Sequence, residues 1–357
     1  MPSAIRLRRS DIATPGITRR RKGNSKGWQY LEEGDGRVED PEILQRIEEL
    51  VIPPAWEQVW ICPYPGGHIQ ATGIDQKGRK QYLYHPHWRE RRDAQKFEDM
   101  VEFARRLPQL RARVDEDLAR ADMGRDRVLA AAVRLLDRGF FRIGSEDYAV
   151  KNQTYGLATM KRRHCRLKDD VLLFDYPAKH SKRRIQAVID PEVAEIIRRL
   201  KSRRGGGDEL LAYKPSPRGG WADVKSTDIN AYLKDATGHD MSAKDFRTWG
   251  ATVWAAVALG VSGEVPATKT AQKRMVVRAV KEVAYYLGNT PAVARASYID
   301  PRVIDRFQDG LTIAGVMTDL PEDAGEGTAI QGPVEEAVID LVTGGESDAL
   351  EQVPQAA

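Results

Sequence analysis

The chain has 357 residues, 41% hydrophobic and 30% charged, the balance of a globular protein large enough for a substantial core. No run approaches the roughly 18 consecutive apolar residues of a membrane span, and the N-terminus has no apolar segment of the kind found in secretory signals. The two cysteines, Cys62 and Cys165, form no CxxC pair and no disulfide framework, which favours a reducing cytoplasm.

The charge is distributed unevenly along the chain. The formal net charge is +4, but residues 311–357 contain ten acidic side chains and no Lys or Arg. Residues 1–310 therefore hold 56 basic and 42 acidic side chains, a net charge of +14. A body of this kind is expected to bind polyanions by releasing counterions from phosphates. Basic surfaces also occur on many proteins that bind no nucleic acid, so charge alone does not decide the partner.

The first 90 residues predict a strand-rich domain. A helix is expected over Pro41–Leu50, with Asp40 as its N-cap. Three short β-type runs follow, separated by turns rich in Pro and Gly. They are Glu57–Cys62, His68–Ile74 and Lys80–Tyr84.

Helical periodicity dominates from about Phe97 onward. The segment before it, His85–Lys96, is almost entirely polar and is either a linker or the start of the next helix. Two sets of apolar residues each share one helix face. They are Met100, Phe103, Ala104 and Leu107, then Val128, Ala131, Ala132, Leu135 and Leu136. One β interlude predicts a three-stranded sheet or paired hairpins. Its runs are Thr159–Cys165, Val171–Tyr176 and Arg183–Val188.

These patterns together predict an α+β protein of three parts. A strand-rich domain covers residues 1–90, and a mostly helical domain with a small β-sheet covers residues 91–310. Residues 311–357 form an acidic tail whose Gly, Ala and Glu content predicts that it is largely disordered. A short helix over Val334–Val342 fits the pattern within that tail.

Five polar residues stand beside the elements expected in the helical domain. Arg142 follows an apolar helix, Lys179 lies in a tight turn between two strands, and Arg247 stands near the start of another apolar helix. Asn289 precedes a helical turn that begins with proline, and Tyr298 follows nine residues later.

This set of side chains suits the cleavage of a phosphodiester bond. Two planar guanidinium groups can make paired bonds to phosphate oxygens and stay charged. A lysine can protonate the departing oxygen as a general acid, and an asparagine amide can donate to a phosphate oxygen. Tyrosine can serve as the nucleophile, although no obvious base lies near Tyr298 in the sequence. Each residue alone has a commoner role, such as a buried ring, an ion pair, or for Asn289 a helix cap.

The ordered set resembles the catalytic pentad of type IB DNA topoisomerases, in the spacing of the compact poxvirus-like enzymes found in bacteria. The segments KDFRTWG and NTPAVARASYI are similar to signature segments of that family. In the N-terminal part, PGITRRRKGNSKGWQY, IPPAWEQVWICPYPGGHIQATG and GRKQYLYH resemble bacterial members. The resemblance covers roughly residues 5–307. It departs from the poxviral and eukaryotic enzymes at Asn289, where they have histidine and bacterial members commonly have asparagine.

The resemblance implies an enzyme that relaxes positive and negative supercoils by transient cleavage of one DNA strand. Tyr298 would join the 3′ phosphate, Lys179 would be the general acid, and Arg142, Arg247 and Asn289 would hold the phosphate. No ATP, metal or other cofactor is expected. Two domains would form a clamp around duplex DNA, and the enzyme would act as a monomer in the cytoplasm, at the nucleoid.

Further DNA contacts are expected outside these five residues. Gln81, Tyr82 and Tyr84 resemble the family strand that faces the major groove, where Gln can read adenine edges and tyrosine hydroxyls can hold phosphates. Lys80 and Lys244 are expected to bind phosphates. The other interpretation of residues 80–84 is a strand with ordinary alternating exposure.

Two other functions remain open from the sequence. A tyrosine site-specific recombinase uses similar chemistry, but it typically carries a His-x-x-Arg box, where this chain has Lys244-x-x-Arg247, and a helical N-terminal domain. A catalytically silent DNA-binding protein of the same fold would not need all five residues.

Overall fold

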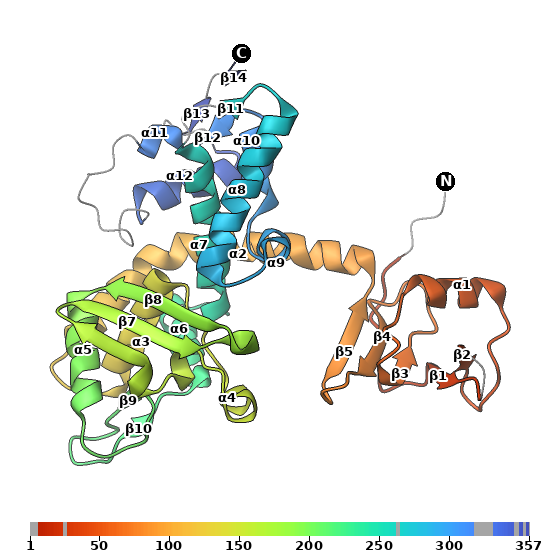
Figure 1. The fold of residues 1–357 in the computed structure, drawn as a ribbon, viewed down its shortest axis with the longest axis horizontal. Helices are drawn as coiled ribbons and strands as arrows, with labels where there is room; N and C mark the ends of the chain where they lie inside the picture. Colours follow the sequence, from red (N-terminus) through yellow and green to blue (C-terminus); the bar gives the residue numbers. More distant parts are fainter. Residues whose placement is uncertain are drawn as a thin grey trace. The chain divides into compact units, whose positions relative to one another are not determined.

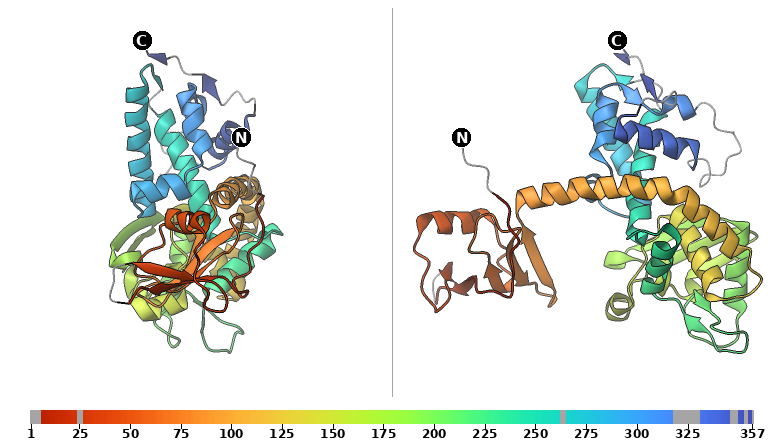
Figure 2. Two further views of the ribbon diagram at one scale, coloured as in Figure 1. Left: turned by 90° about the vertical axis from the view of Figure 1, so that its right-hand side faces the viewer. Right: turned by 180° about the vertical axis from the view of Figure 1, so that it is seen from behind.

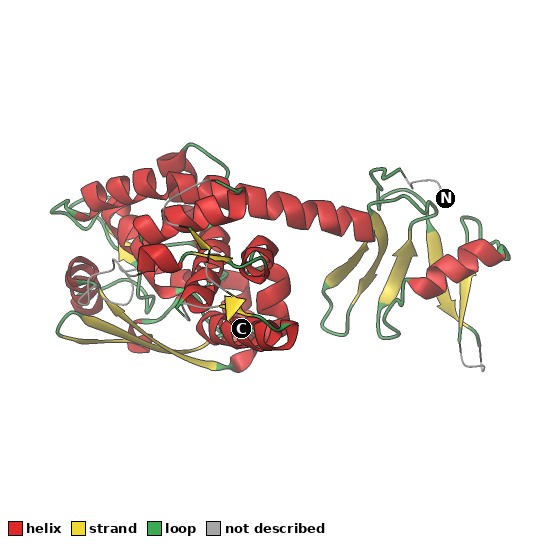
Figure 3. Cartoon of the chain, turned by 90° about the horizontal axis from the view of Figure 1, so that it is seen from above, coloured by secondary structure: helices red, strands yellow, loops and turns green. Residues whose placement is uncertain are grey.

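The computed structural model describes residues 6–23, 27–261, 265–317, 331–345, 350–352 and 355–356. The chain forms two compact units, residues 1–96 and 97–357. Figure 3 shows mainly strands in the first unit and mostly helices in the second. The division falls within helix α2 (Pro86–Leu118), so the polar segment His85–Lys96 is the start of a helix and not a linker.

The first unit is an antiparallel sheet of five strands covered by one helix, in the order β2-β1-β3-β4-β5. Helix α1 (Pro41–Glu49) begins where predicted, because the Asp40 carboxylate accepts from the backbone N–H of Glu42 at 2.8 Å. Ile47 of α1 packs with Val59, Ile61 and Ala71 of the sheet. The strands are β1 (Ile17–Arg21), β2 (Trp28–Leu31), β3 (Glu57–Ile61), β4 (Ile69–Ile74) and β5 (Lys80–Tyr84). The first two strands are absent from the sequence-based prediction, since their basic or aromatic residues show no clear alternation.

The second unit is mostly helical. Its larger helices after α2 are α3 (Arg125–Gly139), α5 (Pro191–Ser202), α6 (Ser226–Thr237), α7 (Ala243–Gly260), α8 (Lys269–Leu287) and α12 (Pro333–Thr343). The shorter ones are α4 (Glu146–Asn152), α9 (Pro291–Ser297), α10 (Pro301–Gln308) and α11 (Ala314–Met317). Short two-residue strands complete it: β9 (Ala212–Tyr213), β10 (Ala222–Asp223), β11 (Val265–Pro266), β12 (Leu311–Thr312), β13 (Glu351–Gln352) and β14 (Gln355–Ala356).

A three-stranded antiparallel sheet lies on one side of this unit, as predicted. Its order is β6 (Cys165–Lys168), β7 (Val171–Pro177), β8 (Arg183–Ile189), and α3 and α5 pack against it. The run Thr159–Cys165 is not a strand. It forms two short 3-10 turns, Leu157–Thr159 and Arg162–His164, before β6 begins.

Helix α7 is the centre of the second unit. It packs against α3, α8, α10 and α12, and the ribbons in Figures 1 and 2 show α8 running beside it. Both predicted apolar faces, on α2 and on α3, are buried in the same core. None of the helices in the described ranges has the length and apolar character needed to cross a membrane.

The short helix that the pattern predicts over Val334–Val342 is present as α12 (Pro333–Thr343), so the predicted disorder of the tail does not extend to it. Glu335 accepts hydrogen bonds from Arg111 and from the indole Nε1 of Trp249 at 2.8 Å. The composition of the tail hides a stripe of apolar residues at helical spacing, and burial of that stripe orders the helix. The buried residues are Val334, Ala337, Val338, Leu341 and Val342. The described part of the predicted tail also holds β12, α11, β13 and β14, whereas residues 318–330, 346–349, 353–354 and 357 lie outside the described residues.

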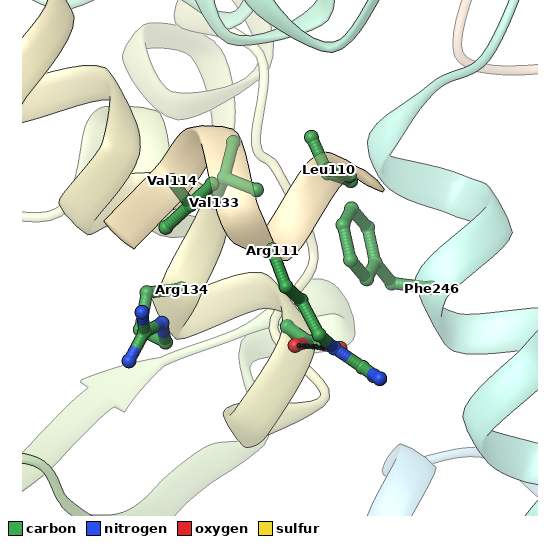
Figure 4. A pocket seen from close by; sticks show the side chains of 7 residues that line it. Leu110, Arg111, Val114, Val133, Arg134 and Phe246 are labelled. Atoms are coloured by element: carbon green, nitrogen blue, oxygen red, sulfur yellow. Dashed lines mark hydrogen bonds and ion pairs between the residues drawn. The ribbon is translucent and has the colours of Figure 1, made fainter. Parts of the chain in front are cut away.

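A small cavity lies where Arg111 of α2 meets α3 and α7. Leu110, Val133 and Phe246 are among its walls, and Arg111 extends past them toward the Asp137 carboxylate (Figure 4). Its volume of about 10 Å³ is room for no more than one water molecule. The cavity therefore belongs to the packing of the core.

Candidate active site

Arg142 is held by a close approach of two backbone segments. Helix α3 ends at Phe140, which has a left-handed φ of 52° and turns the chain. A Cβ on Gly156 would lie 2.6 Å from the Arg142 carbonyl oxygen, so only glycine fits there. The Leu157 N–H then donates to that carbonyl at 2.8 Å. The position of Arg142 is thus set by the backbone on both sides.

Arg247 lies in the second turn of α7 and is almost fully buried, with 4% of its surface exposed. The helix begins at Ser242, whose backbone N–H donates to the Asp245 carboxylate at 2.8 Å. The guanidinium of Arg247 donates to the carbonyl of Phe140 and, at 2.9 Å, to that of Leu287. It therefore joins the turn before Arg142 to the end of α8.

Asn289 follows the left-handed Gly288 that ends α8. Its side-chain Oδ1 accepts a hydrogen bond from Nη2 of Arg142. The N-cap of α9 is Thr290, whose hydroxyl accepts from the Val293 N–H at 3.3 Å. The capping role that the sequence left open for Asn289 is thus filled by its neighbour, and the Asn289 amide faces the arginine.

Tyr298 stands at the end of α9, which follows the C-terminal end of α8 and packs against that helix (Figure 1). Thr252 of α7 lies within hydrogen-bond distance of the Tyr298 carbonyl, at 3.3 Å, and accepts from the Asp300 N–H at 3.1 Å. The guanidinium carbon of Arg247 lies 5.3 Å from the centre of the Tyr298 ring. Helix α7 thus carries Arg247 and, through Thr252, also contacts the backbone at and after Tyr298.

The charges around Tyr298 favour its phenolate form. Burial raises the pKa of Tyr298, but the positive charges of Arg247 and Arg142 outweigh burial, and the net shift is downward. Burial and then the charge of Arg142 lower the pKa of Arg247 to about 10, so this guanidinium is still protonated at neutral pH. The site therefore offers positive charge next to a tyrosine that ionises more readily than usual.

Lys179 lies in the turn between β7 and β8 and is exposed. With Arg142 and Asn289 it lines a cleft of about 210 Å³. The other basic residues on this cleft are Lys182, Arg183 and Arg184. Tyr298 is not among the lining residues, so the structure brings Arg142, Arg247, Asn289 and Tyr298 together and places Lys179 in the cleft that adjoins them.

Two buried donors in this group form no well-aligned hydrogen bond among the described residues, although the Arg247 and Asn289 side chains also act on the Tyr298 oxygen and help to lower its pKa. They are Nε of Arg247 and Nδ2 of Asn289. Buried polar groups without partners are few in folded proteins, because each forfeits the free energy of solvation. Two such donors beside two guanidinium groups fit a ligand that carries several anionic oxygens, such as a phosphodiester.

Sequence reasoning missed two residues that position this group. Thr252 is fully buried in an otherwise apolar stretch of α7, and a polar residue in such a place is a recognisable signal. Arg184 of β8 donates to the carbonyl of Tyr285 at 2.8 Å and to that of Tyr286. Its sequence context, a basic hairpin, gave no such signal, because its partners lie about a hundred residues away.

The predicted DNA contacts on β5 fall on two faces of the strand. Lys80, Tyr82 and Tyr84 are exposed, and the two tyrosine rings stack with centres 6.0 Å apart. Gln81 points to the opposite face, where its Nε2 donates to the Asp75 carboxylate at 2.8 Å. The structure therefore groups Lys80 with the tyrosines and leaves Gln81 in a different environment.

The remaining predicted contact, Lys244, is exposed one turn before Arg247 on α7. As for metals, no group of three His, Cys, Asp or Glu side chains within the described ranges is arranged to hold an ion.

Comparison with known proteins gives the family. Residues 85–316 match the model of the eukaryotic DNA topoisomerase I catalytic core, and residues 27–75 match the bacterial DNA topoisomerase IB N-terminal domain. The first match covers more than half of the chain. The chain therefore belongs to the type IB DNA topoisomerase family and is an isomerase.

Viral relatives span most of this chain. DNA topoisomerase 1B of Acanthamoeba polyphaga mimivirus is 28% identical over 299 residues, which are 82% of this chain and 88% of the relative. DNA topoisomerase I of monkeypox virus is 21% identical over 272 residues, 75% of this chain and 82% of the relative. DNA topoisomerase 1B of vaccinia virus (strain Copenhagen) has the same identity and coverage.

Proposed function

We propose that this enzyme relaxes positive and negative supercoils by cutting one strand of duplex DNA through a 3′-phosphotyrosyl bond to Tyr298. The observation that carries the proposal is the pair of buried donors on Arg247 and Asn289, neither of which makes a well-aligned hydrogen bond, beside a tyrosine whose pKa these side chains help to lower. A scissile phosphate in that position would give both donors a partner and would meet the nucleophile.

In the proposed reaction the phenolate oxygen of Tyr298 attacks the phosphorus atom. The bond from phosphorus to the tyrosine oxygen forms, and the bond to the 5′ oxygen breaks. Lys179 donates a proton to that departing oxygen, and Arg142, Arg247 and Asn289 hold the nonbridging oxygens as their negative charge develops. Religation reverses the same step, so the bond energy is conserved and no ATP is needed. The chemistry has no step that calls for a metal.

The proposal includes how the enzyme holds DNA. The two units would close around the duplex as a clamp, with the enzyme acting as a monomer in the cytoplasm. Lys80, Tyr82 and Tyr84 form an exposed basic and aromatic face on β5 that suits phosphate contacts, and Lys244 adds a cation beside the site. Gln81 would have to leave Asp75 to read a base edge.

The test is relaxation of supercoiled plasmid with EDTA present and ATP absent, with a denaturant quench in parallel. We expect relaxation and a covalent protein–DNA adduct on the 3′ side of the nick. Both should vanish in Tyr298→Phe, while noncovalent DNA binding stays nearly unchanged. Tyr213→Phe, which alters another half-buried tyrosine on β9, is the matched control and should retain both.

An adduct that persists in Tyr298→Phe would refute the nucleophile. DNA binding without relaxation in the unmodified protein would refute the proposed activity. Holliday-junction substrates would then show whether the chemistry is that of a tyrosine recombinase.

A further inference from the structure

Among the described residues that line the cationic cleft, one is aromatic. Tyr285, in the last turn of α8, lines the cleft together with Arg142, Lys179 and Asn289, and 78% of its surface is exposed. The proposed reaction gives this ring no task. A mostly exposed aromatic residue that lines a strongly cationic cleft suits a ligand that combines an anionic group with an apolar face.

The ring of Tyr285 belongs to a cluster of aromatic side chains. It packs edge-to-face on Tyr286, with centres 5.8 Å apart. Tyr286 in turn stacks on Trp254 at 5.1 Å and on Phe140 at 6.4 Å. This aromatic column, made of Tyr285, Tyr286, Trp254 and Phe140, contacts the Tyr285 ring through Tyr286 and leaves 78% of the Tyr285 surface exposed. Such a ring loses little conformational entropy when a second flat group stacks on it.

The backbone of the same aromatic column accepts hydrogen bonds from arginines at the candidate active site. Arg184 donates to the carbonyls of Tyr285 and Tyr286, and Arg247 donates to the carbonyl of Phe140. Tyr285 stands four residues before Asn289, across the turn that ends α8, and both residues line the cleft. In that turn the Gly288 N–H donates to the Tyr285 carbonyl and the Asn289 N–H to the Ala284 carbonyl, both at 3.0 Å. Neighbouring nucleotides rise about 3.4 Å along a strand, so a phosphate at Asn289 places the next nucleoside within reach of Tyr285.

We propose that Tyr285 is a stacking platform for the nucleobase next to the scissile phosphate, and this inference rests on the proposed function of the site. The cleft would then recognise a nucleotide in two parts, with its cations on the phosphate and the tyrosine ring on the base. Cleavage frees the end of the strand, and a terminal base that loses its neighbour can stack on the ring. Stacking of this kind is tolerant of sequence, because every base has a flat apolar face.

The experiment uses the full-length enzyme and short duplexes that contain one cleavage site, with single-turnover rates of cleavage and religation measured separately. Abasic positions are introduced one at a time on either side of the scissile phosphate. We expect Tyr285→Ala to change at least one of the two rates by about 5- to 100-fold, the range that alanine substitution gives for one stacked base. Tyr285→Phe keeps the ring and should stay within about twofold of the unmodified enzyme. Val277→Ala, two turns earlier on the exposed face of α8, is the matched control and should have no effect.

The decisive result is coupling between the ring and one base. At one position, removal of the base should slow the unmodified enzyme to the level of Tyr285→Ala and should have little further effect on that variant. If every abasic substrate slows both enzymes by the same factor, or if Tyr285→Ala behaves like the unmodified enzyme, the inference is wrong. Failure of the proposed function is distinguishable, because the unmodified enzyme would then form no adduct with any substrate.

Discussion

Thr252 connects the backbone of Tyr298 to the helix that carries Arg247. Its hydroxyl oxygen lies 3.3 Å from the Tyr298 carbonyl and accepts from the Asp300 N–H at 3.1 Å. Because Thr252 and Arg247 share α7, any movement of that helix moves the proposed nucleophile and the proposed phosphate ligand together. The hydroxyl group, and not the size of the side chain, makes this connection.

Replacing Thr252 with valine keeps the shape of the side chain and removes the hydroxyl. The buried Asp300 N–H then loses its partner, which should cost about 1–3 kcal/mol of the free energy of unfolding. Cleavage at saturating DNA should slow by about tenfold or more, because small displacements of a nucleophile are costly, while the dissociation constant for DNA stays the same. Single-turnover cleavage and equilibrium binding measure the two effects. Thr252→Ser retains the hydroxyl and should restore the rate, and equal rates for the two variants would contradict the positioning role.

Substitution of either arginine should impair the chemical step. Arg142→Ala and Arg247→Ala should each slow cleavage by at least about 10²-fold, the scale for the loss of one donor to a developing charge. Arg247→Lys keeps the charge and loses the planar fork, so it should remain slow. Arg198→Ala removes an exposed arginine from α5 and serves as the control. Single-turnover rates within tenfold of the unmodified enzyme, in folded Arg142→Ala or Arg247→Ala protein, would remove these roles.

The lowered pKa of Tyr298 predicts an early titration step. The ordinary phenol ionises near pH 10, and a pKa below that value means that the phenolate forms at lower pH. The difference in tyrosinate absorbance between the unmodified enzyme and Tyr298→Phe, followed against pH without DNA, isolates this one residue. In Arg142→Ala one of the charges that lower the pKa is gone, so the step should move to higher pH. A step at or above pH 10 in the unmodified enzyme would show that the charges do not outweigh burial.

Helix α12 should contribute to stability through Glu335. Glu335→Ala removes the partner of Trp249 Nε1 and one of the two carboxylates that hold Arg111, the other being Asp137. We expect the free energy of unfolding to fall by about 1–3 kcal/mol, measured by chemical denaturation. Glu336→Ala removes an exposed charge from the next position and should change the free energy by less than about 0.5 kcal/mol. If the two variants lose equal stability, the ion pairs of Glu335 do not hold the helix.

The sequence was sufficient for features that depend on local pattern. Helix α1 begins at Asp40, and α9 begins with Pro291, because capping and proline chemistry act within a few residues. The buried faces of α2 and α3 follow from apolar residues at helical spacing. The family also follows from the sequence, since several segments far apart in the chain resemble one set of enzymes.

Features that depend on partners distant in the sequence were not predictable. The sequence predicts the helix α12 but not that Arg111 and Trp249 are the partners of its Glu335, and strands β1 and β2 form by pairing with each other and with β3. On β5, strand alternation places Gln81 opposite Tyr82, and the contact with Asp75 occupies its amide.

The sequence by itself determined which side chains this protein has for its chemistry and in what order they occur. Only the tertiary structure decided that Arg142 donates to Asn289, that the buried donors of Arg247 and Asn289 lie beside Tyr298, and that Tyr285 lines the cleft. The physical reason is that helices and strands are specified by interactions between residues a few positions apart, such as capping and apolar spacing. Burial and the distances between charges arise only when segments that lie about 100 or more residues apart, such as those of Arg142 and Asn289, pack together.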